Sequence, residues 1–205
     1  WISKQGYLTA WTAHGSAPAA GVRDAAFSPN SRQVLSCSGD KTVKAWHGVT
    51  GKHLYTLTGH ASGVRSAKFS PNGRRVLSVD DDSFRLWDVY QHTCLHVVSV
   101  GTAVCCHFSP DGRHIASGSG DGVVRVWNAA GECVCVLEGH NGAVDLVAFS
   151  SSGHHIVSAS SVDRTVRMWG ALSCSPVTPA PAGSWEPAVY FPCLPPLLRD
   201  YFPVW

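Results

Sequence analysis

Residues 108–127 read FSPDGRHIASGSGDGVVRVW: a Phe-Ser-Pro start, a turn, a serine-rich strand, a second turn around an aspartate, and a strand ending in tryptophan. The same order of features occurs four times along the chain. The closing tryptophans are Trp46, Trp87, Trp127 and Trp169, at gaps of 41, 40 and 42 residues. Self-similarity at a nearly constant period indicates a repeat architecture, so the period decides the fold before any local pattern is considered.

Each repeat begins with an aromatic residue and a tight turn. Asn72-Gly73 and Asp111-Gly112 favour hairpin turns because these residues tolerate positive φ. Short runs rich in Val, Ile and Thr beside the turns predict strands. A period of about 40 to 45 residues with four short strands is typical of a β-propeller blade. The sequence therefore predicts an all-β protein of about four blades, starting at Phe27, Phe69, Phe108 and Phe149.

Two further sets of residues narrow the class of propeller. Gly-His pairs stand at 59–60 and 139–140, and Trp87-Asp88 forms a Trp-Asp dipeptide. An aspartate stands six residues before each closing tryptophan: Asp40, Asp81, Asp121 and Asp163. Over about residues 1–170 these features resemble the WD40 repeat family, which implies a WD40-type β-propeller.

The resemblance implies a structural hydrogen-bond network in each blade, built from a loop His, a second-strand Ser, the turn Asp and the Trp indole. Buried polar groups of this kind must be hydrogen-bonded. Because the set recurs in every repeat, it is interpreted as structural and not as a Ser-His-Asp catalytic triad. Blade three lacks the loop His, so its network should be incomplete. The candidates are His60, Ser78, Asp81 and Trp87; His140, Ser158 or Ser160, Asp163 and Trp169; and Asp40, Trp46, Asp121 and Trp127.

A second implication of the resemblance is a peptide-binding mouth on the narrow face. Two positions per blade point toward that mouth in the family, one near the start of the first strand and one before the turn Asp. Their charges would suit a polar or charged peptide; the alternative is that they are only rim charges. The candidate partner-binding residues are Arg23, Arg65, Asp80, Val104 and Asp145.

Composition excludes several other classes of function. The net charge is +2 and the Lys and Arg residues are scattered, so there is no basic stripe for nucleic acid. No catalytic set lies outside the repeat positions, and no second cysteine pair accompanies Cys133 and Cys135 to form a zinc site. We expect a non-enzyme without cofactor, metal, membrane span or small-molecule substrate, located in the cytoplasm or nucleus with reduced thiols.

The ends of the chain depart from the repeat. Residues 1–13 match the end of a preceding repeat, with residues 7–12 as an outer strand, and 14–170 hold four WD40 repeats. Residues 171–205 predict a non-propeller tail, since 170–205 contain eight of the twelve prolines. We expect an open arc, an incomplete part of a larger propeller, with residues 7–12 reaching blade four as the alternative. Bare edges of such an arc should make the chain prone to associate.

The expected function is a protein-protein interaction scaffold that binds peptides or proteins. The alternative is a sensor or regulatory propeller of a larger NTPase-switch or ribonucleoprotein-associated protein. A substrate receptor for a cullin-type ligase is disfavoured, because the positions where such receptors usually carry Arg are Val49, Tyr90, Ala130 and Leu172.

Overall fold

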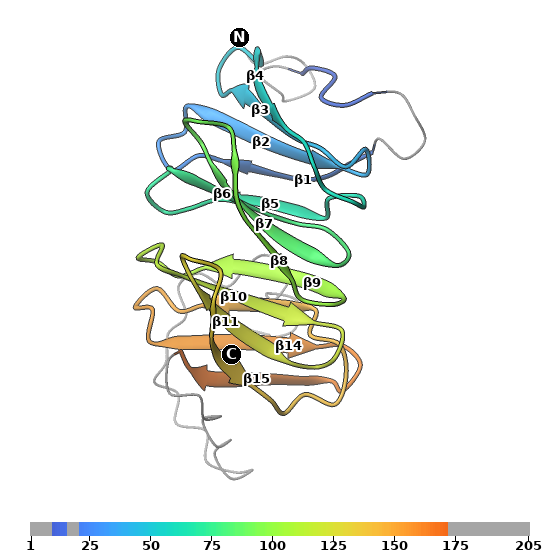
Figure 1. Ribbon diagram of the computed structural model, residues 1–205, viewed down its shortest axis with the longest axis vertical. Helices are drawn as coiled ribbons and strands as arrows, with labels where there is room; N and C mark the ends of the chain where they lie inside the picture. The colour runs from blue at the N-terminus through green and yellow to red at the C-terminus, as the bar shows by residue number, and fades with distance from the viewer. Residues whose placement is uncertain (1–9, 16–20, 172–205) are drawn as a thin grey trace, which may run out of the picture.

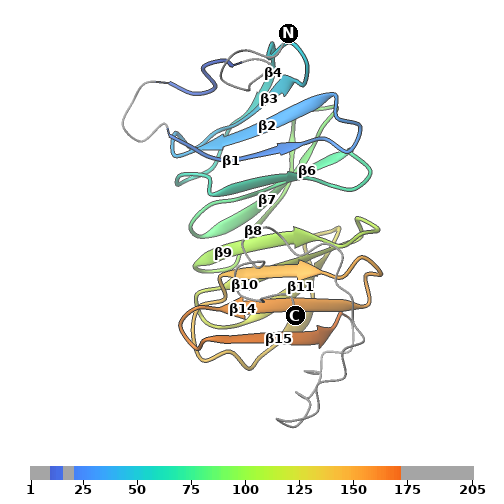
Figure 2. The same cartoon turned by 180° about the vertical axis from the view of Figure 1, so that it is seen from behind.

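The structure, a computed structural model, describes residues 10–15 and 21–171. These residues contain strands and turns and no helix, which confirms the all-β prediction. The strands form four antiparallel sheets, one for each sequence repeat. Figures 1 and 2 show the sheets stacked in chain order, each packed on the next.

Each sheet is a meander of consecutive strands, four in blades one to three and three among the described residues of blade four. Blade one holds β1 (Val22–Phe27), β2 (Gln33–Ser38), β3 (Val43–His47) and β4 (His53–Leu57). Blade two holds β5 (Ser66–Phe69), β6 (Arg75–Val79), β7 (Ser83–Asp88) and β8 (Cys94–Ser99). Blade three holds β9 (Ala103–Phe108), β10 (His114–Ser119), β11 (Val124–Asn128) and β12 (Cys133–Leu137). Blade four holds β13 (Leu146–Phe149), β14 (His155–Ser160) and β15 (Thr165–Gly170).

The turn after each first strand is fixed by the side chains that the sequence places there. In blade two, the Ser70 hydroxyl donates to Asn72 Oδ1 at 2.8 Å, and Gly73 adopts a φ of 70°. The left-handed conformation is accessible to Gly without steric cost, which explains the Asn-Gly pair. The same serine is buried, and its Oγ accepts the Arg75 backbone N–H at 2.9 Å, so the turn closes the first strand pair.

The hydrophobic core lies between the sheets and not within any one of them. Between blades two and three, Leu77 and Leu86 of one sheet share a buried cluster with Phe108, Ile115 and Trp127 of the next. Equivalent clusters join blades one and two and blades three and four. A blade therefore depends on its neighbours to bury both of its faces, as expected for a repeat protein.

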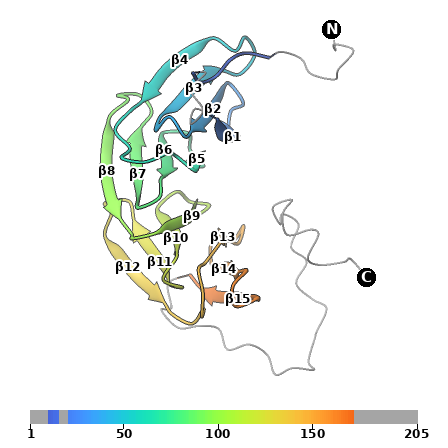
Figure 3. The same cartoon turned by 90° about the vertical axis from the view of Figure 1, so that its right-hand side faces the viewer.

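The four blades form an open arc. In Figure 3, β1, β5, β9 and β13 lie on the inner side of a C-shaped curve, β4, β8 and β12 lie on the outer side, and the two ends do not meet. This confirms the predicted open arc. Residues 7–9 of the predicted strand 7–12 and residues 172–205 of the tail lie outside the described residues, so the division into 1–13, 14–170 and 171–205 stays a prediction.

Removing a side chain from an inter-blade cluster should destabilise the whole arc. Leu86→Ala leaves a cavity between blades two and three, because Leu86 is fully buried there. We expect a loss of about 2–5 kcal/mol in the free energy of unfolding, measured by urea denaturation. Leu95→Ala, on the exposed side of β8, is the matched control and should cost less than about 1 kcal/mol. Equal losses for the two variants would contradict this description of the core.

Candidate functional site

Blade four contains a complete network that links its third strand to the loop before its first strand. The indole N–H of Trp169 donates to Ser158 Oγ at 2.8 Å, and this oxygen lies 2.8 Å from Nε2 of His140. Nδ1 of His140 lies 2.7 Å from Asp163 Oδ2. With the proton on Nδ1, every donor has an acceptor: indole to hydroxyl, hydroxyl to imidazole, imidazole to carboxylate.

Blade one carries the same network with a histidine from the chain ahead of β1. His14 is 2.8 Å from Asp40 Oδ2 through Nδ1 and 2.9 Å from Ser36 Oγ through Nε2. The Trp46 indole donates to the same hydroxyl at 2.8 Å. Thr42 adds a hydroxyl bond to Asp40 at 2.7 Å, so a second side chain orients the carboxylate.

In blade two the sequence predicts Asp81 as the aspartate of the network, and this prediction is wrong. Asp80, and not Asp81, lies 2.8 Å from His60 Nδ1, and the side chain of Asp80 is only 1% exposed. Asp80 directly follows Val79, the last residue of β6, whereas Gly39 separates Asp40 from the last residue of β2. The turn after β6 is therefore shorter than the turn after β2. The first carboxylate of the turn is therefore the one held beside His60, where Ser83 also bonds it at 2.9 Å.

Asp80 was also predicted as a partner-binding residue, and this prediction is wrong. Its two oxygens are used by His60 and by the turn itself, so it is not available to a partner at the surface. Asp81 is the surface carboxylate of this turn, and it accepts a bond from Arg65 Nε at 2.5 Å. Trp87 and Ser78 keep their predicted places, with the indole N–H donating to the hydroxyl at 2.7 Å.

Blade three has a shorter network, as the sequence predicts. The Trp127 indole donates to Ser117 Oγ at 2.8 Å, but Val100 occupies the loop position and packs into the apolar cluster between blades two and three. Without a histidine partner, Asp121 turns outward and pairs with Arg125 at 2.8 Å. Its spacing matches that of the other turn aspartates, so only the missing histidine could have indicated this difference.

Burial and hydrogen bonding shift the pKa values of these groups. Burial lowers the pKa of His60, and this outweighs the opposing bond to Asp80, so the neutral imidazole is favoured. Burial alone would raise the pKa of Asp80, but the bonds from His60, Ser83 and two backbone amides lower it below its usual range. The pKa of Asp163 is likewise lowered, because bonds from Thr165, His140 and the backbone outweigh its burial.

The remaining candidate partner-binding residues lie beside the turns between second and third strands. Arg65 and Asp145 directly precede β5 and β13 and are exposed. Their backbone N–H groups bond the carbonyl of Val79, the last residue of β6, and that of Ala159, the next-to-last residue of β14. Arg23, in β1, is exposed and donates to the Gly63 carbonyl at 3.3 Å. Val104 belongs to β9, and its side chain lies outside the described residues.

These rim residues make contacts that the sequence alone did not indicate. Arg65 pairs with Asp81, Arg23 reaches the loop of the next blade, and Asp145 Oδ2 accepts the Ser161 backbone N–H at 2.6 Å. The opposite charges at Arg65 and Asp81 could have suggested a pair, but the misassigned turn aspartate concealed it. The structure brings Arg65 and Asp81 together; it shows no contact between Asp145 and either arginine among the described residues.

Other site classes find no support in the described ranges. No group of three His, Cys, Asp or Glu side chains in residues 10–15 and 21–171 is placed to hold a metal ion. Along the same residues, no helix has the length and apolar character that a membrane crossing requires. Burial raises the pKa values of Cys37 and Cys105 to about 12, so these thiols stay protonated at neutral pH.

The family profile described as "WD domain, G-beta repeat" matches residues 6–47, 51–88, 92–128 and 131–170. The chain belongs to the WD40 repeat family. WD40 repeat proteins generally act as scaffolds for protein interactions, and the family is generally non-enzymatic.

Several named relatives are about 30% identical to the chain over the aligned residues. Nuclear distribution protein PAC1 of Arthroderma benhamiae is 34% identical over 168 residues, covering 69% of this chain and 36% of the relative. Transcription initiation factor TFIID subunit 5 of Caenorhabditis elegans is 30% identical, covering 74% and 23%. Autophagy-related protein 16 of Arabidopsis thaliana is 29% identical, covering 75% and 32%. The chain thus spans about a third of the length of these relatives or less.

The two neighbouring aspartates of blade two provide a direct test of the corrected WD40 network. Asp80→Ala leaves the buried His60 without its acceptor, and we expect a loss of about 1–3 kcal/mol in the free energy of unfolding. Asp81→Ala removes a surface ion pair with Arg65 and should cost less than about 1 kcal/mol. Chemical denaturation of both variants decides the assignment, which fails if Asp81→Ala is the more destabilising change.

The lowered pKa values predict a loss of stability in acid. A lowered folded-state pKa means that the unfolded chain binds more protons, so stability is present above the unfolded pKa and falls as pH drops. For His60 the loss should begin below pH ~6.5, and for Asp80 below pH ~4. Asp80→Asn keeps an oxygen for His60 but cannot titrate, so its stability should fall less between pH 5 and 3. Melting temperatures across pH 3–7 give both curves, and parallel curves would contradict the linkage.

Proposed function

We propose that the chain is a non-catalytic WD40 interaction module that binds a charged peptide or protein segment at the rim formed by Arg23, Arg65, Asp81 and Asp145. The observation that carries the proposal is the position of these exposed charges beside the turns of blades one, two and four. Charged groups at an exposed rim favour specific and rapid association more than raw affinity.

The contacts of the rim residues support a preformed surface. Asp81 is held twice, by Arg65 at 2.5 Å through its carboxylate and by Ser62 Oγ at 3.1 Å through its backbone N–H. Arg23 is positioned against the carbonyl of Gly63 in the loop of the next blade. Side chains that are already ordered lose less conformational entropy when a partner binds.

A non-catalytic role is supported by how the reactive-looking groups are used. The His, Ser and Asp side chains of blades one, two and four bond one another and a tryptophan. The histidine and serine side chains of these sets are buried, so a substrate could not reach them without breaking the blade.

An intracellular location belongs to the same proposal. The names of relatives refer to nuclear distribution, transcription initiation and pre-mRNA processing, the last in a 29% identical protein of Arabidopsis thaliana. This last name favours, as a second candidate, a regulatory propeller within a ribonucleoprotein-associated protein that contacts protein subunits. The same alternative includes a regulatory propeller within a larger NTPase-switch protein.

Charge reversal at the rim should weaken peptide binding. A display library of charged peptides is selected on the 205-residue chain, and the affinity of the enriched peptides is measured by calorimetry. Arg23→Glu with Arg65→Glu should weaken binding at least about tenfold, and added salt should weaken it further. Arg113→Glu, in the exposed turn after β9, is the control and should bind as the wild type does. Equal binding by both variants would show that these residues are only rim charges.

A further inference from the structure

Two apolar side chains of blade four are exposed at positions that are buried in every other blade. Val166 and Met168 on β15 are 47% and 40% exposed. The residues at the same two positions of the third strand in blades one to three are 0–1% exposed, because the next blade covers them: Val43 and Ala45, Phe84 and Leu86, Val124 and Val126. Among the described residues, no blade covers this face of blade four, whereas the next blade covers the same positions in blades one to three.

Blade one exposes the opposite half of the same contact. Phe27 on β1 is 65% exposed, whereas the matching Phe108 and Phe149 are 6% and 9% exposed against the preceding blade. Phe69 likewise packs on the cluster between blades one and two. The face of blade one that points away from blade two therefore exposes Phe27, and no blade among the described residues covers it.

The two open faces are complementary because the chain already contains their contact three times. In each of the three inter-blade clusters, the third strand of one blade meets the Phe and Trp face of the next. Charge also matches. The first of these contacts uses an ion pair between Asp24 and Lys68 at 2.9 Å. At the matching positions of the two open faces stand Leu146 and Ala26, so the contact would leave no unpaired charge at this position.

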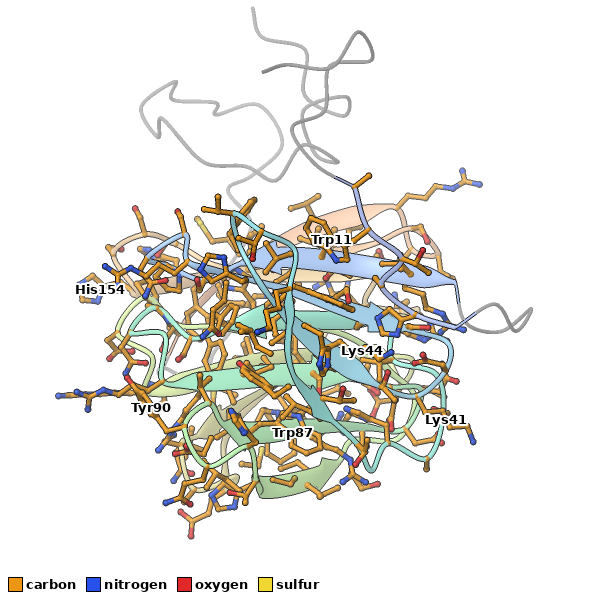
Figure 4. All side chains as sticks on the ribbon, turned by 90° about the horizontal axis from the view of Figure 1, so that it is seen from above. Trp11, Lys41, Lys44, Trp87, Tyr90 and His154 are labelled. Carbon is orange, nitrogen blue, oxygen red and sulfur yellow. The ribbon has the colours of Figure 1, made fainter. Side chains whose placement is uncertain are left out.

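Within residues 10–15 and 21–171, another segment of the chain covers the tryptophan end of the blade-one face. Trp11 lies against Trp46, with ring centroids 6.1 Å apart, and stands three residues before His14 as Leu57 stands before His60. Figure 4 views the molecule from the blade-one end and shows Trp11 over the strands of that blade. No described residue covers the Phe27 end, and this is the part that a third strand contacts in the other blades.

We propose that a second copy of this chain occupies both faces. Blade four of each copy packs on blade one of the other, so that two arcs of four blades close a ring of eight. Eight blades lie within the range of known propellers. A two-fold axis makes both contacts identical, and the pair of different surfaces closes into a ring instead of growing into a filament. The proposal concerns the blade ends and is independent of the rim proposed to bind peptides.

The test uses the 205-residue chain in analytical ultracentrifugation over a range of concentrations. The wild type should sediment at twice the monomer mass of 21.9 kDa. Met168→Glu and Phe27→Glu each place a charge on one open face, so each variant alone should be monomeric. An equimolar mixture should form a 1:1 dimer through one intact contact, weaker than the wild-type dimer, because the second contact carries both introduced charges. Val97→Glu, on the exposed side of β8, is the control and should dimerise as the wild type does.

Circular dichroism and tryptophan fluorescence check that each variant keeps its fold, and the mixture tests the contact even if association is weak. Recovery of the dimer only on mixing supports the head-to-tail contact, since non-specific adhesion would not depend on which variants are combined. A monomeric wild type at high concentration overturns the proposal and assigns the faces to further repeats or to another protein. Association that survives in each single variant overturns it as well.

Discussion

The bond from a tryptophan indole to a second-strand serine is the interaction on which every blade depends. It occurs in all four sheets, at 2.7–2.8 Å. It ties the third strand to the second through groups that are buried between blades, where an unpaired indole N–H or hydroxyl would destabilise the sheet. The histidine and aspartate extend this bond to the loop ahead of the blade. Blade three folds without that extension, so the extension positions a loop while the indole bond holds the strands.

The spacing of the tryptophans allowed the blades, their number and the open arc to be predicted, because a constant period constrains every repeat at once. It could not place the turn carboxylate of blade two. Counting back from Trp87 selects Asp81, whereas the shorter turn after Val79 brings Asp80 to His60. A sequence with three successive aspartates offers no composition signal to separate them. The choice depends on how many residues the turn needs, which is a property of the backbone and not of the side chains.

The same error passed from the network to the candidate site. The count from Trp87 predicts Asp81 as the structural aspartate and Asp80 as the surface charge, so it does not predict the pairing of Arg65 with Asp81. Loop contacts such as Arg23 to Gly63 depend on the relative placement of neighbouring blades, which no single repeat encodes. Periodic positions are therefore predictable from sequence, while the rim that a partner would meet is set by the irregular turns between them.

In a repeat array, the exposure of a residue in one blade can be compared with that of the residue at the same position in the other blades. A side chain that is buried in three copies of a blade and exposed in the fourth reports a missing neighbour more directly than its hydrophobicity does, because the other copies show what that position contacts. Phe27 and Met168 are exposed for this reason and not because the surface tolerates them. The two residues lie at opposite ends of one arc, and the contact they lack is the one that the arc forms three times within itself. A blade of this repeat type is the kind of surface that the three internal contacts show to fit these positions.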